Sequence, residues 1–159
     1  MIYLIRVYNT GISSKIYCFV YNTTRYANRR GENDMSEKVL VIGGNAAGMS
    51  AASQLRRMKK ETEIIVFEKG THVSYSSCGI PYYVGNLVDN WHNMISRTKE
   101  EFEQNNIHVQ LRHEVKKIDT AGKTLEVTDL ESGKTVTEPW DKLLIATGSV
   151  PMRPPVPGI

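Results

Sequence analysis

Apolar and polar positions follow one another from residue 39 onward in a pattern that marks out two strands and a helix. Val39 begins four apolar residues that run directly into Gly43, which is typical of a buried parallel strand followed by a tight turn. The helical pattern of residues 46–60 follows, and the apolar run of residues 64–67 ends at Glu68. The pattern therefore predicts a βαβ unit with a glycine turn between its first strand and its helix.

The predicted helix has one apolar and one basic face. Its apolar stripe, which we expect to pack on the sheet, contains Met49, Ala52 and Leu55 and can be extended by Met58. The basic residues expected on the solvent face are Arg56, Arg57, Lys59 and Lys60.

The second half of the chain is rich in strand patterns. A capping box predicts a short helix over residues 98–104, and alternating apolar positions predict a strand over residues 107–111. Residues 115–139 indicate an antiparallel hairpin or three-stranded meander, and residues 143–146 another buried strand. The predicted fold class is α/β, a Rossmann-like parallel sheet with an attached antiparallel β-meander.

The glycine turn meets the requirements of a dinucleotide-binding site. Gly43 allows a sharp exit from the strand, Gly48 allows the helix to pack closely, and the helix N-terminus offers N–H groups to a pyrophosphate. Glu68 lies where an acid can bind the hydroxyls of an adenosine ribose. Asn45 replaces the middle glycine of G-x-G-x-x-G, and Asn is the residue that most readily takes a positive φ. A glycine turn alone also occurs in ordinary βα loops. The prediction of dinucleotide binding therefore depends on the strand before the turn, the helix after it and the acid at residue 68 taken together.

Charge divides this chain of 159 residues, which is about one domain long, into two parts. Residues 1–34 hold five Lys or Arg and two acids, whereas residues 35–159 hold fifteen of each, so the net charge of +3 comes from the first part. The balanced second part gives no indication of a nucleic-acid partner. No apolar run reaches the roughly 18 residues that a membrane span requires.

The sequence falls into three segments. Residues 1–34 lack the continuous apolar region of a signal peptide. The Arg-Arg-Gly-Glu sequence at residues 29–32 can be encoded by a purine-rich stretch resembling a ribosome-binding site, so one hypothesis is that translation begins at Met35. The alternative is a genuine N-terminal extension. Residues 35–150 form the predicted domain, and residues 151–159, with four of the six prolines, form a predicted linker towards a further domain.

Cys78 is the candidate nucleophile. Pro81 favours a helix start and Gly85 a helix end, so the thiol is expected at a helix N-terminus, where the dipole and free N–H groups favour the reactive thiolate. The alternative, a small buried hydrophobic residue, is disfavoured by the neighbouring serines. Cys18 and Cys78 show no metal or disulfide spacing, so no metal is expected, and free thiols suit a reducing cytoplasm.

Residues 35–159 resemble the N-terminal part of the flavin-dependent pyridine nucleotide-disulfide oxidoreductases. The similarity is to the branch that contains coenzyme A-disulfide reductase, NAD(P)H-dependent persulfide reductases and NADH oxidase or peroxidase. Residues 1–34 have no counterpart in it. The matched motifs are V-I-G-G-N-A-A-G at residues 41–48, I-I-V-F-E at 64–68, S-Y-S-S-C-G-I-P-Y at 74–82 and L-I-A-T-G-S-x-P at 144–151.

The resemblance implies an FAD site around the glycine turn. The pyrophosphate would lie against the turn, the adenosine ribose against Glu68, and the adenylate and ribityl chain along Val115 and the turn that follows residue 146. The FAD-binding positions that the resemblance implies are Gly43, Asn45, Ala46, Ala47, Gly48, Glu68, Lys69, Val115, Thr147 and Gly148.

The resemblance also makes Cys78 the single redox-active cysteine, which cycles as a mixed disulfide with coenzyme A or as a sulfenic acid. Oxidases and peroxidases of this branch usually carry histidine at the position of Ala46, so alanine favours a coenzyme A-disulfide or persulfide reductase over an NADH oxidase. Arg57 is a candidate phosphate ligand or, alternatively, a solvated charge. The implied substrate-binding positions are Ser50, Gln54, Arg57, Ser74 and Ser77.

The family is longer than this chain. It adds an NAD(P)H-binding domain, the returning half of the FAD domain and a domain that forms the homodimer. We therefore expect a truncated cytoplasmic flavoprotein segment that is inactive alone. The alternatives are a non-catalytic fragment, one half of a split enzyme, or an NAD-binding module without flavin, which would leave the Cys78 motif unexplained.

Overall fold

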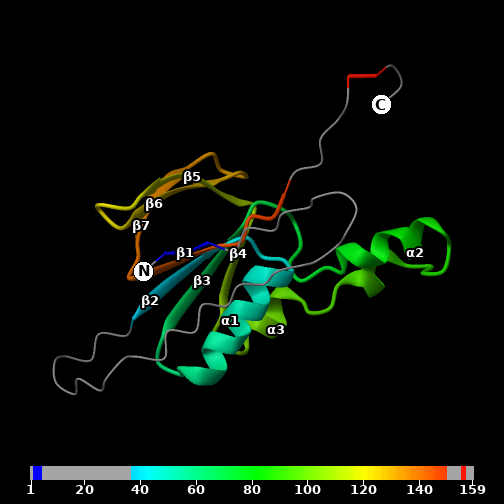
Figure 1. The fold of residues 1–159 in the computed structure, drawn as a ribbon, viewed down its shortest axis with the longest axis horizontal. Coiled ribbons are helices and arrows are strands. Elements are labelled where there is room, and N and C mark those ends of the chain that lie inside the picture. Colours follow the sequence, from blue (N-terminus) through cyan, green and yellow to red (C-terminus); the bar gives the residue numbers. More distant parts are fainter. Residues whose placement is uncertain (1, 5–36, 150–154, 157–159) are drawn as a thin grey trace.

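The computed structural model describes residues 2–4, 37–149 and 155–156, which form two sheets and three helices (Figure 1). The proposed start at Met35 and most of the predicted linker lie outside these residues. The strands are β1 (Ile2–Leu4), β2 (Lys38–Ile42), β3 (Glu63–Glu68), β4 (His108–Leu111), β5 (His113–Asp119), β6 (Thr124–Asp129), β7 (Thr135–Pro139) and β8 (Lys142–Ile145). The helices are α1 (Ala46–Met58), α2 (Ile80–Val84) and α3 (Lys99–Glu103), and 3₁₀ turns occupy Ser77–Gly79 and Trp91–Met94.

The larger sheet is parallel, with the strand order β1-β8-β2-β3-β4. Strand β2 lies between β8 and β3, with Leu40 opposite both Leu143 and Ile65, and all three side chains are buried. Strand β1, which the sequence pattern did not predict, pairs with the outer edge of β8. Strands β5, β6 and β7 form the antiparallel meander. The prediction of an α/β fold with a parallel sheet and an antiparallel meander is confirmed.

The parallel sheet is covered on both faces, by α1 and α3 on one side and by the antiparallel sheet on the other (Figure 1). On the helix side, Met49 and Phe102 pack with Ile64 and Val66 of β3. On the other side the core is formed by Leu40, Phe67, Leu125, Val127, Trp140 and Leu143 with their neighbours. None of the helices in the described part of the chain is long and apolar enough to cross a membrane.

Helix α1 corrects two of the predictions for its faces. Met49 and Ala52 are buried and Leu55 packs against the core as expected, but Met58 is 73% exposed because the helix ends there, at the C-cap Lys59. Arg56 does not simply point into solvent. Its guanidinium group donates to the carbonyl oxygens of Thr62 at 2.7 Å and Asn106 at 2.5 Å, and so ties the end of α1 to two neighbouring segments.

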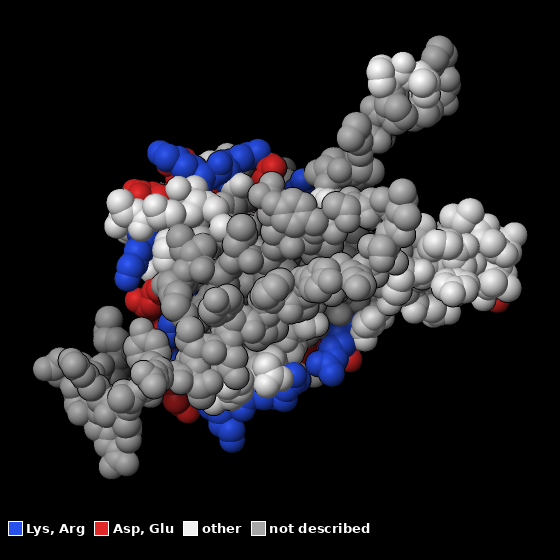
Figure 2. Space-filling view, in the orientation of Figure 1, with Lys and Arg blue, Asp and Glu red and all other residues white. Residues whose placement is uncertain are grey.

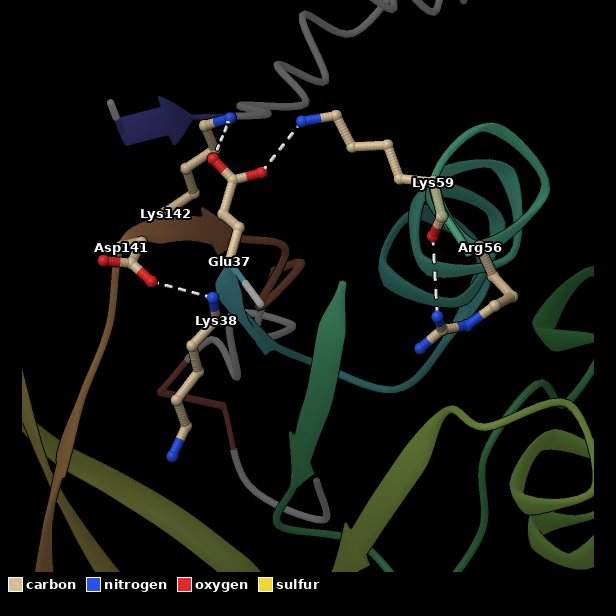
Figure 3. A network of polar contacts seen from close by, with 6 residues as sticks. All are labelled: Glu37, Lys38, Arg56, Lys59, Asp141 and Lys142. Carbon is tan, nitrogen blue, oxygen red and sulfur yellow. Dashed lines mark hydrogen bonds and ion pairs between the residues drawn. The ribbon is translucent and has the colours of Figure 1, made fainter. Parts of the chain in front are cut away.

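An ion-pair network closes the end of the sheet where β2 begins (Figure 3). The Glu37 carboxylate bonds to Lys59 at 3.0 Å and also to Lys142, so it joins the end of α1 to β8. Burial by itself would raise the pKa of Glu37, but these two lysines hold it below its ordinary value. The backbone N–H of Lys38 donates to the Asp141 carboxylate at 2.8 Å. The network lies at the end of β2 away from Gly43.

Candidate functional site

Gly43 occupies a position that no other residue can take without strain. Its φ is +106°, and a Cβ there would lie 2.3 Å from the carbonyl oxygen of Ala146. The turn after β8 therefore packs directly against the glycine turn after β2, and it brings Thr147 and Gly148, with φ +69°, to the same end of the sheet. Both residues are exposed there.

Helix α1 starts directly on this turn. A Cβ on Gly48 would lie 1.9 Å from the carbonyl oxygen of Gly43, so glycine permits the close approach. Asn45 is the N-cap, but its side chain does not bond to the first helical turn, which leaves the N–H groups of that turn without a side-chain cap. The N–H groups concerned are those of Ala46, Ala47 and Gly48.

The interpretation of Asn45 as a substitute for a positive-φ glycine is wrong. Its φ is −105°, in the extended region that N-cap residues adopt. The residue that needs to be small is Gly44, because a Cβ there would lie 2.7 Å from the Val73 side chain and 2.9 Å from that of Glu68. Among the residues that the structure describes, the buried side-chain oxygen of Asn45 has no hydrogen-bond partner, so it can still accept a hydrogen bond at the turn.

Glu68 is fixed at the end of β3 by two backbone groups. Its carboxylate oxygens accept hydrogen bonds from the N–H groups of Gly44 and Gly70, each at 2.7 Å. A carboxylate has about four acceptor positions, so it can still accept bonds from ribose hydroxyl groups. The acid is therefore oriented next to the glycine turn before any ligand is present.

Lys69 directly follows Glu68, and Val115 lies on β5. The N–H of Arg112 donates to the carbonyl oxygen of Gly70 at 3.0 Å, which joins the start of β5 to the turn after β3. Lys69 is near Glu114, whose pKa is lowered first by its bond to Lys116 and more weakly by Lys69. Val115 is half-buried and pairs with Val127 of β6.

These residues fit a dinucleotide. The uncapped N–H groups at the start of a 13-residue helix suit a pyrophosphate, and the glycine turn leaves room for it. The oriented carboxylate of Glu68 suits a ribose. The ten predicted FAD positions lie on the glycine turn, in the first turn of α1, at the end of β3, on β5 or in the turn after β8.

Cys78 is exposed and lies in the 3₁₀ turn that leads into α2, rather than in the first turn of α2 itself. The predicted helix is present, with Pro81 near its start and Gly85 as its C-cap. Ser76 anchors the turn, because its N–H donates to the carbonyl oxygen of Met94 at 2.7 Å. The thiol therefore stands on a short, solvent-facing segment.

Three of the five predicted substrate residues line one groove of about 280 Å³ beside α1: Ser50, Arg57 and Ser74. Gln54 lies next to it and accepts a hydrogen bond of 2.6 Å from Arg57, whereas Ser77 is exposed beside Cys78 and does not line the groove. Ser74 has φ +52°, and its N–H donates to the carbonyl oxygen of Gly44 at 2.8 Å, so the groove borders the glycine turn. Sequence reasoning missed Arg97, which also lines the groove.

Comparison with known proteins places this arrangement in a family. Residues 37–159 match the family model described as pyridine nucleotide-disulphide oxidoreductase. An NADH oxidase of Enterococcus faecalis is 38% identical over 122 residues, which cover 77% of this chain and 27% of the oxidase. A coenzyme A disulfide reductase of Staphylococcus epidermidis is 35% identical over 113 residues, which cover 70% of this chain and 26% of the reductase.

The solved structure of an NAD-dependent persulfide reductase from A. fulgidus has a TM-score of 0.72 and 40% sequence identity, and the match covers 75% of this chain and 22% of that one. The chain thus spans about a quarter of the length of the curated relatives it matches. The strand order, the glycine turn and the sequence similarity agree with one another. The chain belongs to the pyridine nucleotide-disulphide oxidoreductase family.

Proposed function

We propose that this chain is the first FAD-binding segment of an NAD(P)H-dependent reductase that acts on coenzyme A disulfide or a persulfide. The observation that carries the proposal is the exposed Cys78 thiol, which stands on a loop bonded to the groove beside the glycine turn. A nucleotide site and a solvent-facing thiol on one framework are what a flavin-dependent disulfide reductase requires.

The ten residues named above would hold FAD, with the pyrophosphate at the start of α1 and the ribose at Glu68. Bound FAD supplies the two electrons that reopen a disulfide on Cys78. The role of this chain is to orient the nucleotide, to present the thiol and to bind the substrate in the groove.

The thiol chemistry follows from the exposure of Cys78. Its thiolate attacks one sulfur of the substrate disulfide, so that a bond forms between Cys78 and that sulfur and the other half leaves as a thiolate. Two electrons then cleave the mixed disulfide, releasing the second thiolate and restoring Cys78. Cys78 is the only cysteine among the described residues, so these residues offer no second thiol for an internal disulfide. The disulfide partner of Cys78 in this proposal is therefore a diffusible thiol.

An NADH oxidase of the same fold is the second candidate, and the 38%-identical relative from Enterococcus supports it. Ala46 favours the reductase, because a methyl group cannot assist a sulfenic acid through a hydrogen bond or a proton. A non-catalytic fragment is the remaining alternative.

The proposal extends to an intact cytoplasmic homodimer that takes electrons from NADH or NADPH. The lobe that carries α2 is nearly free of charged atoms in Figure 2, and Ile80, Tyr82, Val84 and Leu87 are exposed on it. Exposed apolar surface of this kind is typical of a protein contact, which supports a covering domain or subunit over α2.

Oxidised coenzyme A provides the test. The full chain is incubated with coenzyme A disulfide and digested without reductant, and the expected product is one coenzyme A attached to Cys78, with none on Cys18. The Cys78→Ser variant should acquire none. Modification of Cys18 in preference to Cys78, or an unmodified Cys78, would contradict the proposal.

A further inference from the structure

Strand β8 has the burial of an inner strand. Leu143 packs in the core under the antiparallel sheet and Leu144 in the core on the helix side, and both are buried. At the opposite edge of the parallel sheet, β4 begins with the exposed His108. Apolar residues on both faces are typical of parallel strands inside a sheet, and an uncovered edge beside them is a template for pairing. The composition of β8 therefore favours a further strand on its outer side.

The outer edge of β8 is occupied by β1 (Figure 1). The pairing is parallel, and its residue pairs are Ile2 with Leu143, Tyr3 with Leu144 and Leu4 with Ile145. A connection between parallel strands takes roughly a dozen residues or more, and residues 5–37, which join β1 to β2, exceed this length. The chain can therefore supply its own edge strand.

The backbone groups of β8 that face β1 follow from the hydrogen bonds on its other side. The N–H of Ala146 donates to the carbonyl oxygen of Ile42 on β2 at 2.8 Å. Backbone groups along a strand point alternately to its two neighbours, so those of Leu143 and Ile145 point away from β2 and towards β1. In a parallel pair the residue that points back lies between two such positions in register, and here it is Tyr3. The residues on either side of Tyr3 direct their backbone groups away from β8.

Both ends of β8 make contacts that matter for the candidate site. At its start, Lys142 is ion-paired with Glu37, which precedes β2. After its end, the carbonyl oxygen of Ala146 lies 2.3 Å from where a Cβ on Gly43 would stand. A strand that is paired along both edges holds these contacts in register more firmly than one paired along a single edge. The pairing of β1 with β8 therefore acts on the turn where the dinucleotide is expected.

We propose that the outer edge of β8 is a strand-binding surface and that its occupant is the chain's own segment Ile2–Leu4, which fixes β8 and the turn after it. The segment is then a part of the folded domain, and a chain that began at Met35 would expose the edge of β8. An edge exposed in this way can pair with another chain. Strand β1 acts through its backbone in this proposal and takes no part in the thiol chemistry.

Amide hydrogen exchange, measured by NMR at single residues, tests the pairing. The full chain is compared with a form that begins at Met35. The N–H of Ile145 is the reporter because it points towards β1, and the N–H of Ala146 is the internal reference because it is bonded to β2. We expect Ile145 to exchange at least about tenfold faster in the shorter form, whereas Ala146 should change less than about threefold.

Two proline variants of the full chain separate pairing from the mere presence of residues 1–34. Proline at residue 3 lacks the N–H and turns its ring towards β8, so Tyr3→Pro should expel β1 and bring the exchange of Ile145 to the rate of the shorter form. Leu4→Pro is the matched control, because proline is tolerated on an edge strand where the N–H points away from the sheet. It should leave the exchange of Ile145 within about threefold of the parent.

Equal exchange of Ile145 in the full chain and in the form that begins at Met35 would overturn the proposal, as would equal effects of Tyr3→Pro and Leu4→Pro. Both proline variants keep residues 5–159 unchanged, so their comparison decides the matter even where the shorter form is too unstable to study. Circular dichroism confirms that each variant is folded. These measurements use neither a nucleotide nor a disulfide, so their result is independent of the proposed function.

Discussion

Replacing Arg56 by alanine should destabilise the fold, although the helical pattern alone places this residue on the solvent face. Its guanidinium group donates to the carbonyl oxygens of Lys60, Thr62 and Asn106. These bonds tie the C-terminal end of α1 to the segment that enters β3 and to the turn between α3 and β4. Figure 3 shows a further, longer bond of 3.5 Å from the guanidinium group to the carbonyl oxygen of Lys59, at the end of the same helix.

The loss of unfolding free energy in Arg56→Ala depends on how easily water can replace each of these hydrogen bonds. A hydrogen bond to a charged group contributes about 1.5–3 kcal/mol where water is excluded. Thr62 is buried, so its 2.7 Å bond belongs to this class, whereas Lys60 and Asn106 are exposed and their carbonyl groups can be hydrated. The positive charge at the helix C-terminus adds about 0.5 kcal/mol. We expect Arg56→Ala to lower the free energy of unfolding by about 2 kcal/mol.

Urea denaturation followed by far-UV circular dichroism measures this change. With a denaturant slope of about 2 kcal/mol per molar, the midpoint should fall by about 1 M. Arg57→Ala is the control, because this neighbouring arginine is exposed and, within the described part of the chain, donates only to Gln54. Its free energy of unfolding should stay within about 0.5 kcal/mol of the parent's. Equal midpoints for Arg56→Ala and the parent, or equal losses in the two variants, would refute the reasoning.

Three further predictions concern the turn, acid stability and flavin. Gly48→Ala should cost about 3 kcal/mol in urea unfolding, because its Cβ would meet a backbone oxygen at 1.9 Å, whereas Gly133→Ala, with φ +72° and open space, should cost about 1 kcal/mol. The pKa of Glu37 is lowered in the folded state, so its contribution is present above the ordinary value of 4.5 and is lost as pH falls through the folded pKa. Glu37→Gln should therefore be less stable than the parent at pH 7, and the difference should vanish at low pH; a constant difference would contradict this. The chain alone should bind FAD weakly, because it spans about a quarter of the length of its relatives. Purification as a yellow flavoprotein with one FAD per chain would contradict this prediction.

The local parts of the fold could be predicted from the sequence because short-range physics determines them. The apolar run before Gly43 predicted β2, and the capping box at Thr98 is present, with the Glu101 carboxylate bonded to the Thr98 N–H at 2.7 Å. The meander followed from its turn residues, including Gly133 with its positive φ. Each of these signals lies within a few residues of the element that it specifies.

The features that could not be predicted depend on long-range packing. The contact between Arg56 and Asn106 joins residues 50 positions apart, and no periodic pattern contains it. Strand β1 has only three residues, and its pairing depends on the edge of β8. Arg97 lines the same groove as Arg57, and it follows Ser96, whose N–H is bonded to the carbonyl oxygen of Ser74 far away in the sequence. The sequence therefore pointed to the candidate residues that lie in continuous motifs, and their roles stay predictions. It did not point to Arg97, which a separate segment brings to the groove.

Disulfide reduction by an intact enzyme built on this segment tests the central claim most directly. The measurement is NAD(P)H-dependent reduction of coenzyme A disulfide or a persulfide, with flavin content determined from absorbance in the same preparation. The account predicts that Cys78→Ser abolishes reduction and leaves the flavin content unchanged, because Cys78 lies outside the residues expected to hold FAD. Full turnover by the serine variant would contradict the account and leave Cys78 a structural residue.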